Sequence, residues 1–186
     1  MASSCIRSLP AGTSTRSRCP HWVAAARRDG LDDFVVNGLV FVAIGRDDAE
    51  LADAVRGTKQ QIAFYASTPA YRGVLEAHDR GELQPELTRM STEGKWAEMG
   101  ELIDDELLDL VAVVGDPGMV GRAVVDRWGG IYDRMSLYVN YTLDLEALMA
   151  TVEAVRQGAG VVGGVRRACG TQQYATDDGP KRNRRK

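Results

Sequence analysis

The sequence has few of the residues that build metal centres and disulfide frameworks. Its 186 residues include three cysteines, Cys5, Cys19 and Cys169, and two histidines, His21 and His78. No two cysteines form a C-x-x-C pair and the histidines stand alone, so we expect neither a metal site nor a disulfide framework. Without such a framework, the reducing cytoplasm is the expected location.

Long hydrophobic runs are also missing. Although 44% of the residues are hydrophobic, no run approaches the roughly 20 apolar residues that a membrane-spanning helix needs. The first 20 residues contain no apolar segment of the kind found in secretory signals. We therefore expect neither secretion nor a membrane partner.

Acidic residues are almost absent from the two ends of the chain. Residues 1–28 carry five arginines and no acid, and residues 157–186 have a balance of +5. Residues 29–156 have a balance of −13, which leaves a net charge of −3 for the whole chain. This segregation indicates three segments of different character.

The domain boundaries follow from this charge pattern and from where hydrophobic periodicity stops. We predict a disordered basic flank over 1–21, an ordered domain over 22–157, and a disordered, glycine-rich and basic tail over 158–186. The N-terminal flank also has the composition of a transit peptide, although a disordered start is favoured. The basic run at 181–186 has no interleaved aromatic residues for stacking bases, so nucleic acid is not an expected partner.

Two apolar segments have the pattern of buried parallel strands, Phe34–Ile44 and Ile131–Val139. The short apolar run Val111–Val114 and several amphipathic helical stretches lie between them, and one more helix follows. The helical stretches cover residues 49–66, 70–78, 85–90, 95–110, 119–128 and 144–157. The alternation of strand and helix predicts an α/β protein that is mostly helical. Two strands cannot close a sheet, so the fold looks incomplete.

A polar turn between two helices carries candidate residues for a substrate pocket. Two phenols, two hydroxyls and a guanidinium lie close together in this turn: Tyr65, Ser67, Thr68, Tyr71 and Arg72. The arginine could pair with a carboxylate or a phosphate. The same residues also suit an ordinary surface turn, and that alternative stays open.

A second candidate lies at Gly115-Asp116-Pro117, which begins a helix. Free N–H groups at a helix N-terminus can bind phosphate. Asp116 suits the N-cap position, however, and its charge would repel an anion. Capping is therefore favoured over a phosphate contact at Gly115 and Asp116. A third motif, G-x-G-x-x-G at Gly158, Gly160 and Gly163, follows a helix instead of a strand, so it does not predict a dinucleotide site.

Four segments together resemble the C-terminal part of the luciferase-like monooxygenase family, and most closely its branch that uses coenzyme F-420. They are VVNGLVFVAIG at 35–45, KQQIAFYASTPAYRGVLEAH at 59–78, KWAEMGELIDDELLDLVAVVGDP at 95–117 and GGIYDRMSLY at 129–138. The resemblance covers about residues 22–157 in one register. Its most specific parts are KQQIAFYASTPAYR at 59–72 and the ending GDP-helix-GG-x-x-DR-x-S-L-Y at 115–138.

The resemblance implies a (β/α)₈ TIM-like barrel that holds coenzyme F-420 or FMN at the C-terminal ends of its strands. This chain would contain only an incomplete C-terminal portion of that barrel, with two parallel strands and the helical insertion between them. The turn at 65–72 would then lie near the mouth of the family's pocket. Most cofactor contacts would fall on absent strands, so no catalytic or cofactor-binding residue can be assigned here.

The expected function is therefore that of a fragment of an F-420- or FMN-dependent oxidoreductase, inactive alone and binding neither coenzyme. The intact enzyme would act on a small-molecule substrate. The alternative is a non-enzymatic helical interaction module. Because an open apolar strand edge pairs with other chains, we also expect self-association.

Overall fold

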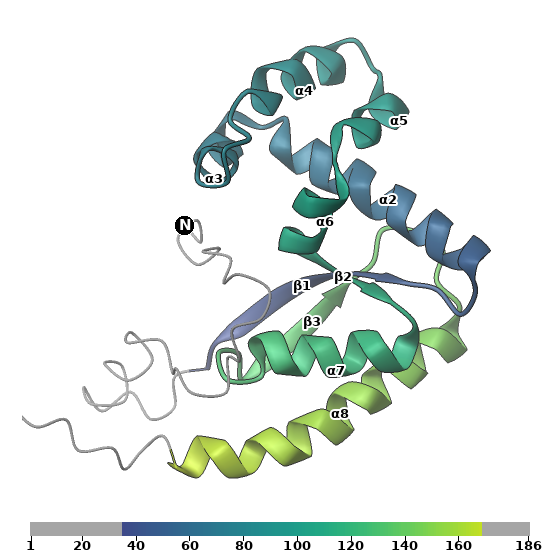
Figure 1. Cartoon of the computed structure of the whole chain (residues 1–186), viewed down its shortest axis with the longest axis vertical. Coiled ribbons are helices and arrows are strands. Elements are labelled where there is room, and N and C mark those ends of the chain that lie inside the picture. The colour runs from purple at the N-terminus through teal and green to yellow at the C-terminus, as the bar shows by residue number, and fades with distance from the viewer. Residues whose placement is uncertain (1–34, 169–186) are drawn as a thin grey trace, which may run out of the picture.

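The computed structural model describes residues 35–168, with side chains through residue 159. A three-stranded parallel sheet lies at its centre (Figure 1). The middle strand is β1 (Asn37–Ile44), flanked by β2 (Ala112–Gly115) and β3 (Arg134–Tyr138). The predicted flank at 1–21 and the part of the predicted tail after Ala168 lie outside the described residues.

The sheet has one strand more than the sequence predicted. The apolar run at 111–114 follows a helix without a break, and four residues are too few to show a strand periodicity. In the sheet, Phe41–Ile44 pair with Ala112–Gly115, and Asn37–Phe41 pair with Arg134–Tyr138. The two outer strands therefore pair with different halves of β1. The prediction of two strands was wrong in number, while the prediction of parallel pairing is confirmed.

The strand order β2-β1-β3 makes the sheet doubly wound. The chain passes from β1 to β2 over one face of the sheet and returns from β2 to β3 over the other face. Right-handed connections require opposite faces when the chain moves first to one edge and then to the other. In a (β/α)₈ barrel each strand pairs with the next one along the chain. This sheet therefore supports the α/β class and does not confirm the predicted barrel.

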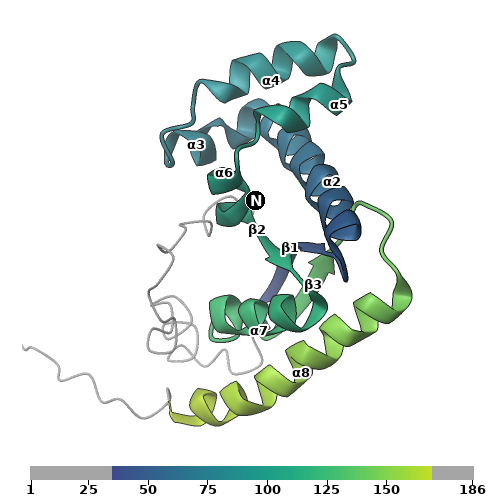
Figure 2. The ribbon, with the colours of Figure 1, turned by 45° about the vertical axis from the view of Figure 1, so that its right-hand side comes forward.

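One layer of helices follows β1 and covers part of the first face (Figure 2). It contains α2 (Asp48–Ala66), the 3₁₀ turn η2 (Pro69–Tyr71), α3 (Arg72–Glu76), α4 (Leu83–Thr92), α5 (Trp96–Met99), the 3₁₀ turn η3 (Gly100–Leu102) and α6 (Asp105–Val111). The helical stretch predicted at 95–110 is therefore broken. Ile103 is extended, and Asp104 then caps α6 by accepting a hydrogen bond from the Leu107 N–H at 2.7 Å.

The second face is covered by α7 (Pro117–Trp128) and α8 (Leu145–Ala168). The two helices approach most closely at Gly121, where a Cβ atom would lie 2.4 Å from the Cβ of Ala154. Helix α8 continues past the predicted end at residue 157. Gly158, Gly160 and Gly163 therefore lie inside a helix, and this arrangement does not form the strand-to-helix loop that a dinucleotide site needs.

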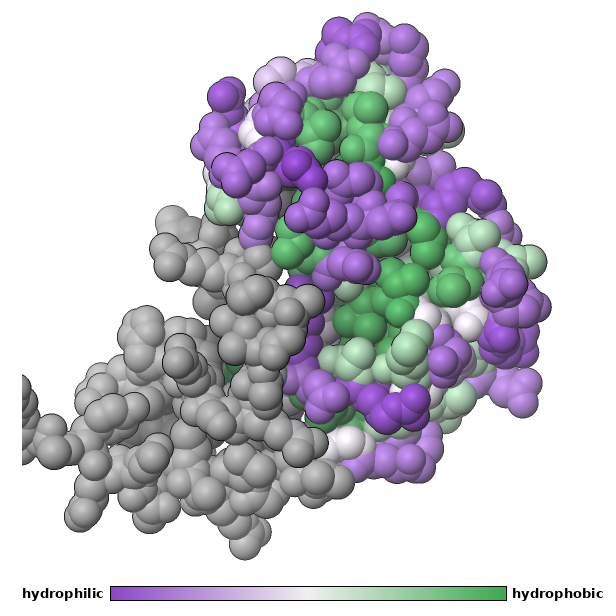
Figure 3. Space-filling model, in the orientation of Figure 1, coloured by the Kyte–Doolittle hydropathy of each residue, from purple (hydrophilic) through white to green (hydrophobic). Residues whose placement is uncertain are grey.

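The core consists of two clusters on opposite faces of β1. Val40, Val42 and Ile44 face α7 and α8, as expected for alternate positions of one strand. Among the described residues, α2 and α6 cover the other face only near the carboxyl end of β1, and Leu39 is 55% exposed. Figure 3 shows hydrophobic side chains gathered near the middle of the viewed surface, with hydrophilic ones over the upper helices. The half of this sheet face that the described helices leave uncovered could accommodate a ligand or a partner.

Candidate functional site

The uncovered sheet face carries a cluster of aromatic rings. Tyr65, near the end of α2, lies 6.1 Å from the ring of Phe41 in β1 and 5.7 Å from that of Tyr71 in η2. Phe41 also lies 4.9 Å from Tyr138, the last residue of β3. Three segments of the chain therefore meet here: β1, β3, and the end of α2 with η2. They meet because β3 pairs with β1 and α2 packs on β1.

The phenols of Tyr65 and Tyr138 interact with each other in this cluster. A hydrogen bond in which the neutral Tyr138 hydroxyl donates to Tyr65 raises the pKa of Tyr138 above its ordinary value, and burial raises it further. Both effects favour the neutral phenol at Tyr138. Phenol rings in such a cluster can stack on a flat ligand, and their hydroxyls can donate or accept hydrogen bonds at its edge.

The other residues of the predicted polar turn have structural contacts. Ser67 is buried, its hydroxyl donates to the Phe64 carbonyl at 2.7 Å, and its own carbonyl accepts from Thr88 at 2.6 Å. Thr68 is exposed at the start of η2, and Arg72 is paired with Glu76 at 2.8 Å. Of the five candidates, the structure brings only Tyr65 and Tyr71 into the aromatic cluster.

The helix start at Gly115-Asp116 has the geometry of a cap. The Asp116 carboxylate accepts a hydrogen bond from the Met119 N–H at 2.9 Å. Gly115 has a φ of +151°, a conformation that side chains rarely adopt. A carboxylate therefore lies at the N-terminus of α7, where a phosphate would otherwise be attracted.

Sequence reasoning did not single out Phe41, Tyr138 or Tyr141. In doubly wound sheets, ligands commonly bind in the crevice at the carboxyl ends of the strands where the strand order reverses. Here Tyr141 fills that crevice, because its hydroxyl accepts from the Ile44 N–H at 2.7 Å and donates to the Val42 carbonyl at 3.3 Å. Burial raises the pKa of this phenol. An aromatic residue at the carboxyl end of a predicted strand was the available signal for Tyr138.

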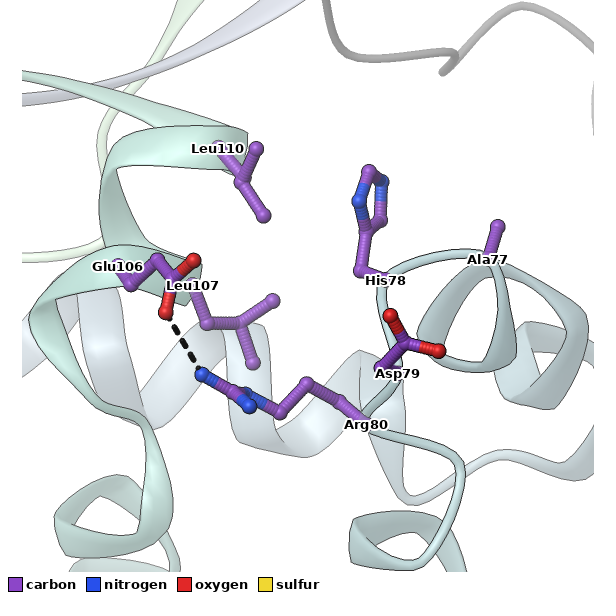
Figure 4. A pocket seen from close by; sticks show the side chains of 7 residues that line it. All are labelled: Ala77, His78, Asp79, Arg80, Glu106, Leu107 and Leu110. Carbon is purple, nitrogen blue, oxygen red and sulfur yellow. Dashed lines mark hydrogen bonds and ion pairs between the residues drawn. The ribbon is translucent and has the colours of Figure 1, made fainter. Parts of the chain in front are cut away.

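A hollow of about 240 Å³ lies between the turn after α3 and helix α6 (Figure 4). His78 and Asp79 stand on one side and Leu110 on the other. Arg80 is held there by Glu106 at 2.8 Å and Asp104 at 3.0 Å. The arginine is thus neutralised by two carboxylates, which weakens any attraction for an anionic ligand.

Two further searches concern the described residues alone. Within them, no group of three or more histidine, cysteine or acidic side chains is arranged to hold a metal ion. In the same part of the chain, no helix is both long and apolar enough to cross a membrane.

Comparisons with known proteins place the chain among its relatives. It is similar to uncharacterized proteins of Mycobacterium bovis and of two strains of Mycobacterium tuberculosis, each 49% identical over 123 residues. These matches cover 65% of this chain but only 36% of each relative. No solved structure matches the chain. The model of the luciferase-like monooxygenase family matches residues 10–133, which is more than half of the chain. The chain therefore belongs to the luciferase-like monooxygenase family.

Proposed function

We propose that this chain forms part of a luciferase-like oxidoreductase that transfers hydride between coenzyme F-420, or FMN, and a small-molecule substrate. Family membership supports an oxidoreductase-type function. The chain spans about a third of the length of its curated relatives, 36%, so the proposal does not include catalysis by these residues alone. Active sites of large α/β enzymes draw residues from several strand ends.

The aromatic cluster with its phenol pair is the observation that carries this proposal. Coenzyme F-420 and FMN each present a flat ring system with polar atoms along its edge. Phe41 and Tyr71 offer ring faces for stacking, and Tyr65 and Tyr138 offer hydroxyls for the edge. The phenol of Tyr138 is neutral at neutral pH, as for any tyrosine with a pKa near 10, and its raised pKa extends the neutral form to more alkaline pH.

The described residues suit the coenzyme ring better than its phosphate. At the carboxyl end of β1, Arg46 is paired with Glu50 at 2.6 Å and also faces Asp144 and Glu146. At the start of α7, Asp116 occupies the cap. The coenzyme supplies the hydride when bound, and in this proposal the chain orients its ring and shields it from water. We therefore expect the isolated chain to bind neither coenzyme appreciably.

Fluorescence titration of the full chain with coenzyme F-420 and with FMN tests the binding expectation. We expect no saturable binding below roughly 100 µM, because a few stacking and hydrogen-bonding contacts leave little net affinity after the entropic cost of association. A dissociation constant in the micromolar range would show that the chain forms a complete site by itself.

A chimera tests the role of the phenol pair. The chimera is a Mycobacterium tuberculosis relative in which the relative's own segment that matches this chain, with the relative's residues that follow it, is exchanged for residues 35–157 of this chain. The rate of coenzyme oxidation by the chimera is then measured. We expect Tyr65→Phe and Tyr138→Phe each to lower the rate about tenfold, the size of one lost hydrogen bond. Tyr132→Phe, on the opposite sheet face, should leave the rate unchanged. Equal rates of coenzyme oxidation in all three variants would show that neither phenol belongs to the site.

The alternative function, a non-enzymatic interaction module, is favoured by one separate feature. A hollow of about 420 Å³ lies beside Phe64 and Trp96, whose rings are 5.9 Å apart and about half exposed. Exposed aromatic pairs are typical of docking surfaces. The coding sequence upstream separates the two functions, because a reading frame that encodes the remaining strand–helix units of a (β/α)₈ barrel would favour the enzyme.

A further inference from the structure

We propose that Gln84 and Thr88, two side chains of α4, are positioning residues that hold the Tyr71 ring at the coenzyme site. This inference rests on the proposed function, in which Tyr71 offers a ring face to the coenzyme. The two side chains act on the segment between Tyr65 and Tyr71, where α2 ends and η2 begins. The contacts that carry the inference join residues within 63–90, so they lie wholly in the described structure.

The chain between the two rings turns at a single extended residue. Ser67 still has a helical backbone, whereas Thr68 is extended, with a φ of −79° and a ψ of 128°. The turn η2 then begins at Pro69, and a proline suits the first position of a helical turn because no N–H group is needed there. The orientation of the peptide between Ser67 and Thr68 therefore sets the direction in which Tyr71 leaves α2.

Both sides of that peptide are hydrogen-bonded. Its N–H, which belongs to Thr68, donates to the Tyr65 carbonyl at 3.0 Å. Its carbonyl, which belongs to Ser67, accepts from the Thr88 hydroxyl at 2.6 Å and from the Gln84 amide at 3.2 Å. The Gln84 amide also donates to Thr88 Oγ1 at 2.7 Å, so the two donors hold each other in place. The orientation of the peptide is thereby fixed by α4.

This peptide determines where the Tyr71 ring lies. The Tyr71 N–H donates to the Thr68 carbonyl at 2.9 Å, which ties η2 to the residue that follows the peptide. None of the residues of η2 is buried by the part of the chain that the structure describes, so packing does little to hold this turn. The turn is connected to the core through the Ser67 carbonyl on one side and through Leu75 of α3 on the other.

Helix α4 is a firm support for the two donors. It packs on α2, since Leu87 and Met90 are buried in the cluster that also contains Ile62 (Figure 1). Gln84 is itself buried, although glutamine is mostly an exposed residue. Burial of an amide is costly unless it is hydrogen-bonded, and the bonds of this amide are made at the break between α2 and η2. The buried amide therefore has a defined task at this break.

Hydrogen exchange of the full chain tests the hold on the turn. Thr88→Val removes one of the two donors, and we expect the Thr68 and Tyr71 amides to exchange about fivefold faster, the size of one hydrogen bond. Thr88→Ser keeps the hydroxyl and should exchange as the native chain does. Thr92→Val, one turn along α4 and exposed, is the matched control and should change neither amide. Unchanged exchange at both amides, or an equal rise in every helix, would overturn the proposal.

Kinetics of the chimera test what the turn does for the coenzyme. Tyr71→Ala should raise the KM for the coenzyme about fivefold and Thr88→Val about threefold, with kcat unchanged, because a stacked ring contributes to coenzyme binding. In the Tyr71→Ala background, Thr88→Val should raise KM no further, since it acts through that ring.

The outcomes separate this inference from the proposed function. If Tyr71→Ala raises the KM and Thr88→Val does not, or if Thr88→Val keeps its full effect without the Tyr71 ring, the positioning role is wrong while the coenzyme site stands. If Tyr71→Ala leaves the KM unchanged, the ring does not bind the coenzyme, and both the proposed site and this inference are wrong.

Discussion

Two buried threonines in helices differ in one respect that stability measurements can detect. Thr58 in α2 and Thr151 in α8 are both 0% exposed. The Thr151 hydroxyl donates to the Ala147 carbonyl at 2.9 Å, whereas the Thr58 hydroxyl has no partner among the described residues. Valine has nearly the shape of threonine and a similar helix propensity. Replacing each threonine by valine therefore isolates the hydroxyl.

The expected effects have opposite signs. A buried hydroxyl without a partner costs about 1–3 kcal/mol, so Thr58→Val should stabilise the protein by about 1–2 kcal/mol. Thr151→Val removes a hydroxyl that is already bonded, so it should cost about 0.5–1 kcal/mol. For a domain of this size, 1 kcal/mol corresponds to a change in Tm of roughly 3–5 °C. The two variants should therefore differ in Tm by more than about 5 °C.

Thermal and urea denaturation followed by circular dichroism measure both variants against the native chain. Circular dichroism spectra of the two variants should coincide at 20 °C, which shows that neither substitution changes the fold. If Thr58→Val is no more stable than Thr151→Val, then the Thr58 hydroxyl has a partner, and the reasoning about its unmet hydrogen bond is wrong.

Three further predictions concern packing and ionisation. Gly121→Ala should lower the free energy of unfolding, measured by urea denaturation, by about 2–4 kcal/mol, because the new Cβ atom would lie 2.8 Å from the Thr151 carbonyl oxygen and must push α8 away. The control is Gly73→Ala, where nothing lies within 4 Å of the new Cβ atom, and it should not destabilise the protein. Arg127→Ala should lower the free energy of unfolding by about 1–3 kcal/mol in the same assay, because this half-buried guanidinium donates to the carbonyl oxygens at the end of α6. Arg127→Lys should restore only part of that stability. The pKa of Tyr138 is raised in the folded state, so this residue contributes stability below its ordinary pKa of about 10, and that stability is lost as pH rises through the folded value. In an absorbance titration at alkaline pH, Tyr65→Phe should lower the pKa of Tyr138. An unchanged pKa would contradict the hydrogen bond between the two phenols.

Hydrophobic periodicity predicted the elements whose burial pattern is regular. The strand at 34–44 and the helix at 49–66 match β1 and α2 within a few residues, because each has enough residues to display its period. The strand β2 has four residues directly after α6, so no period could form. Its strand conformation comes from pairing with β1, which is a tertiary effect that local sequence does not contain.

The candidate site was only partly predictable for the same reason. Tyr65 and Tyr71 lie in one turn, and their closeness is visible in the sequence. Tyr138 is far from them along the chain and reaches Tyr65 because β3 pairs with β1 over Asn37–Phe41. A strand can be predicted correctly from the sequence while the strand that pairs with it is not. The closeness of Tyr65 and Tyr138 depends on the strand order, so it could not be predicted.

The strand order also decides where on this sheet a ligand can lie. In a doubly wound sheet the crevice at the strand ends is the usual site, but Tyr141 closes it by bonding to the backbone of β1 at Ile44 and Val42. Asn140 adds a hydrogen bond to the Gly57 carbonyl of α2 at 2.6 Å. The Tyr141 side chain thus occupies the position at the strand ends where a ligand usually binds in such sheets. Among the described residues, the helices leave β1 uncovered beside Tyr65 and Tyr138, and a partner on that sheet face would complete the cover that a parallel strand requires.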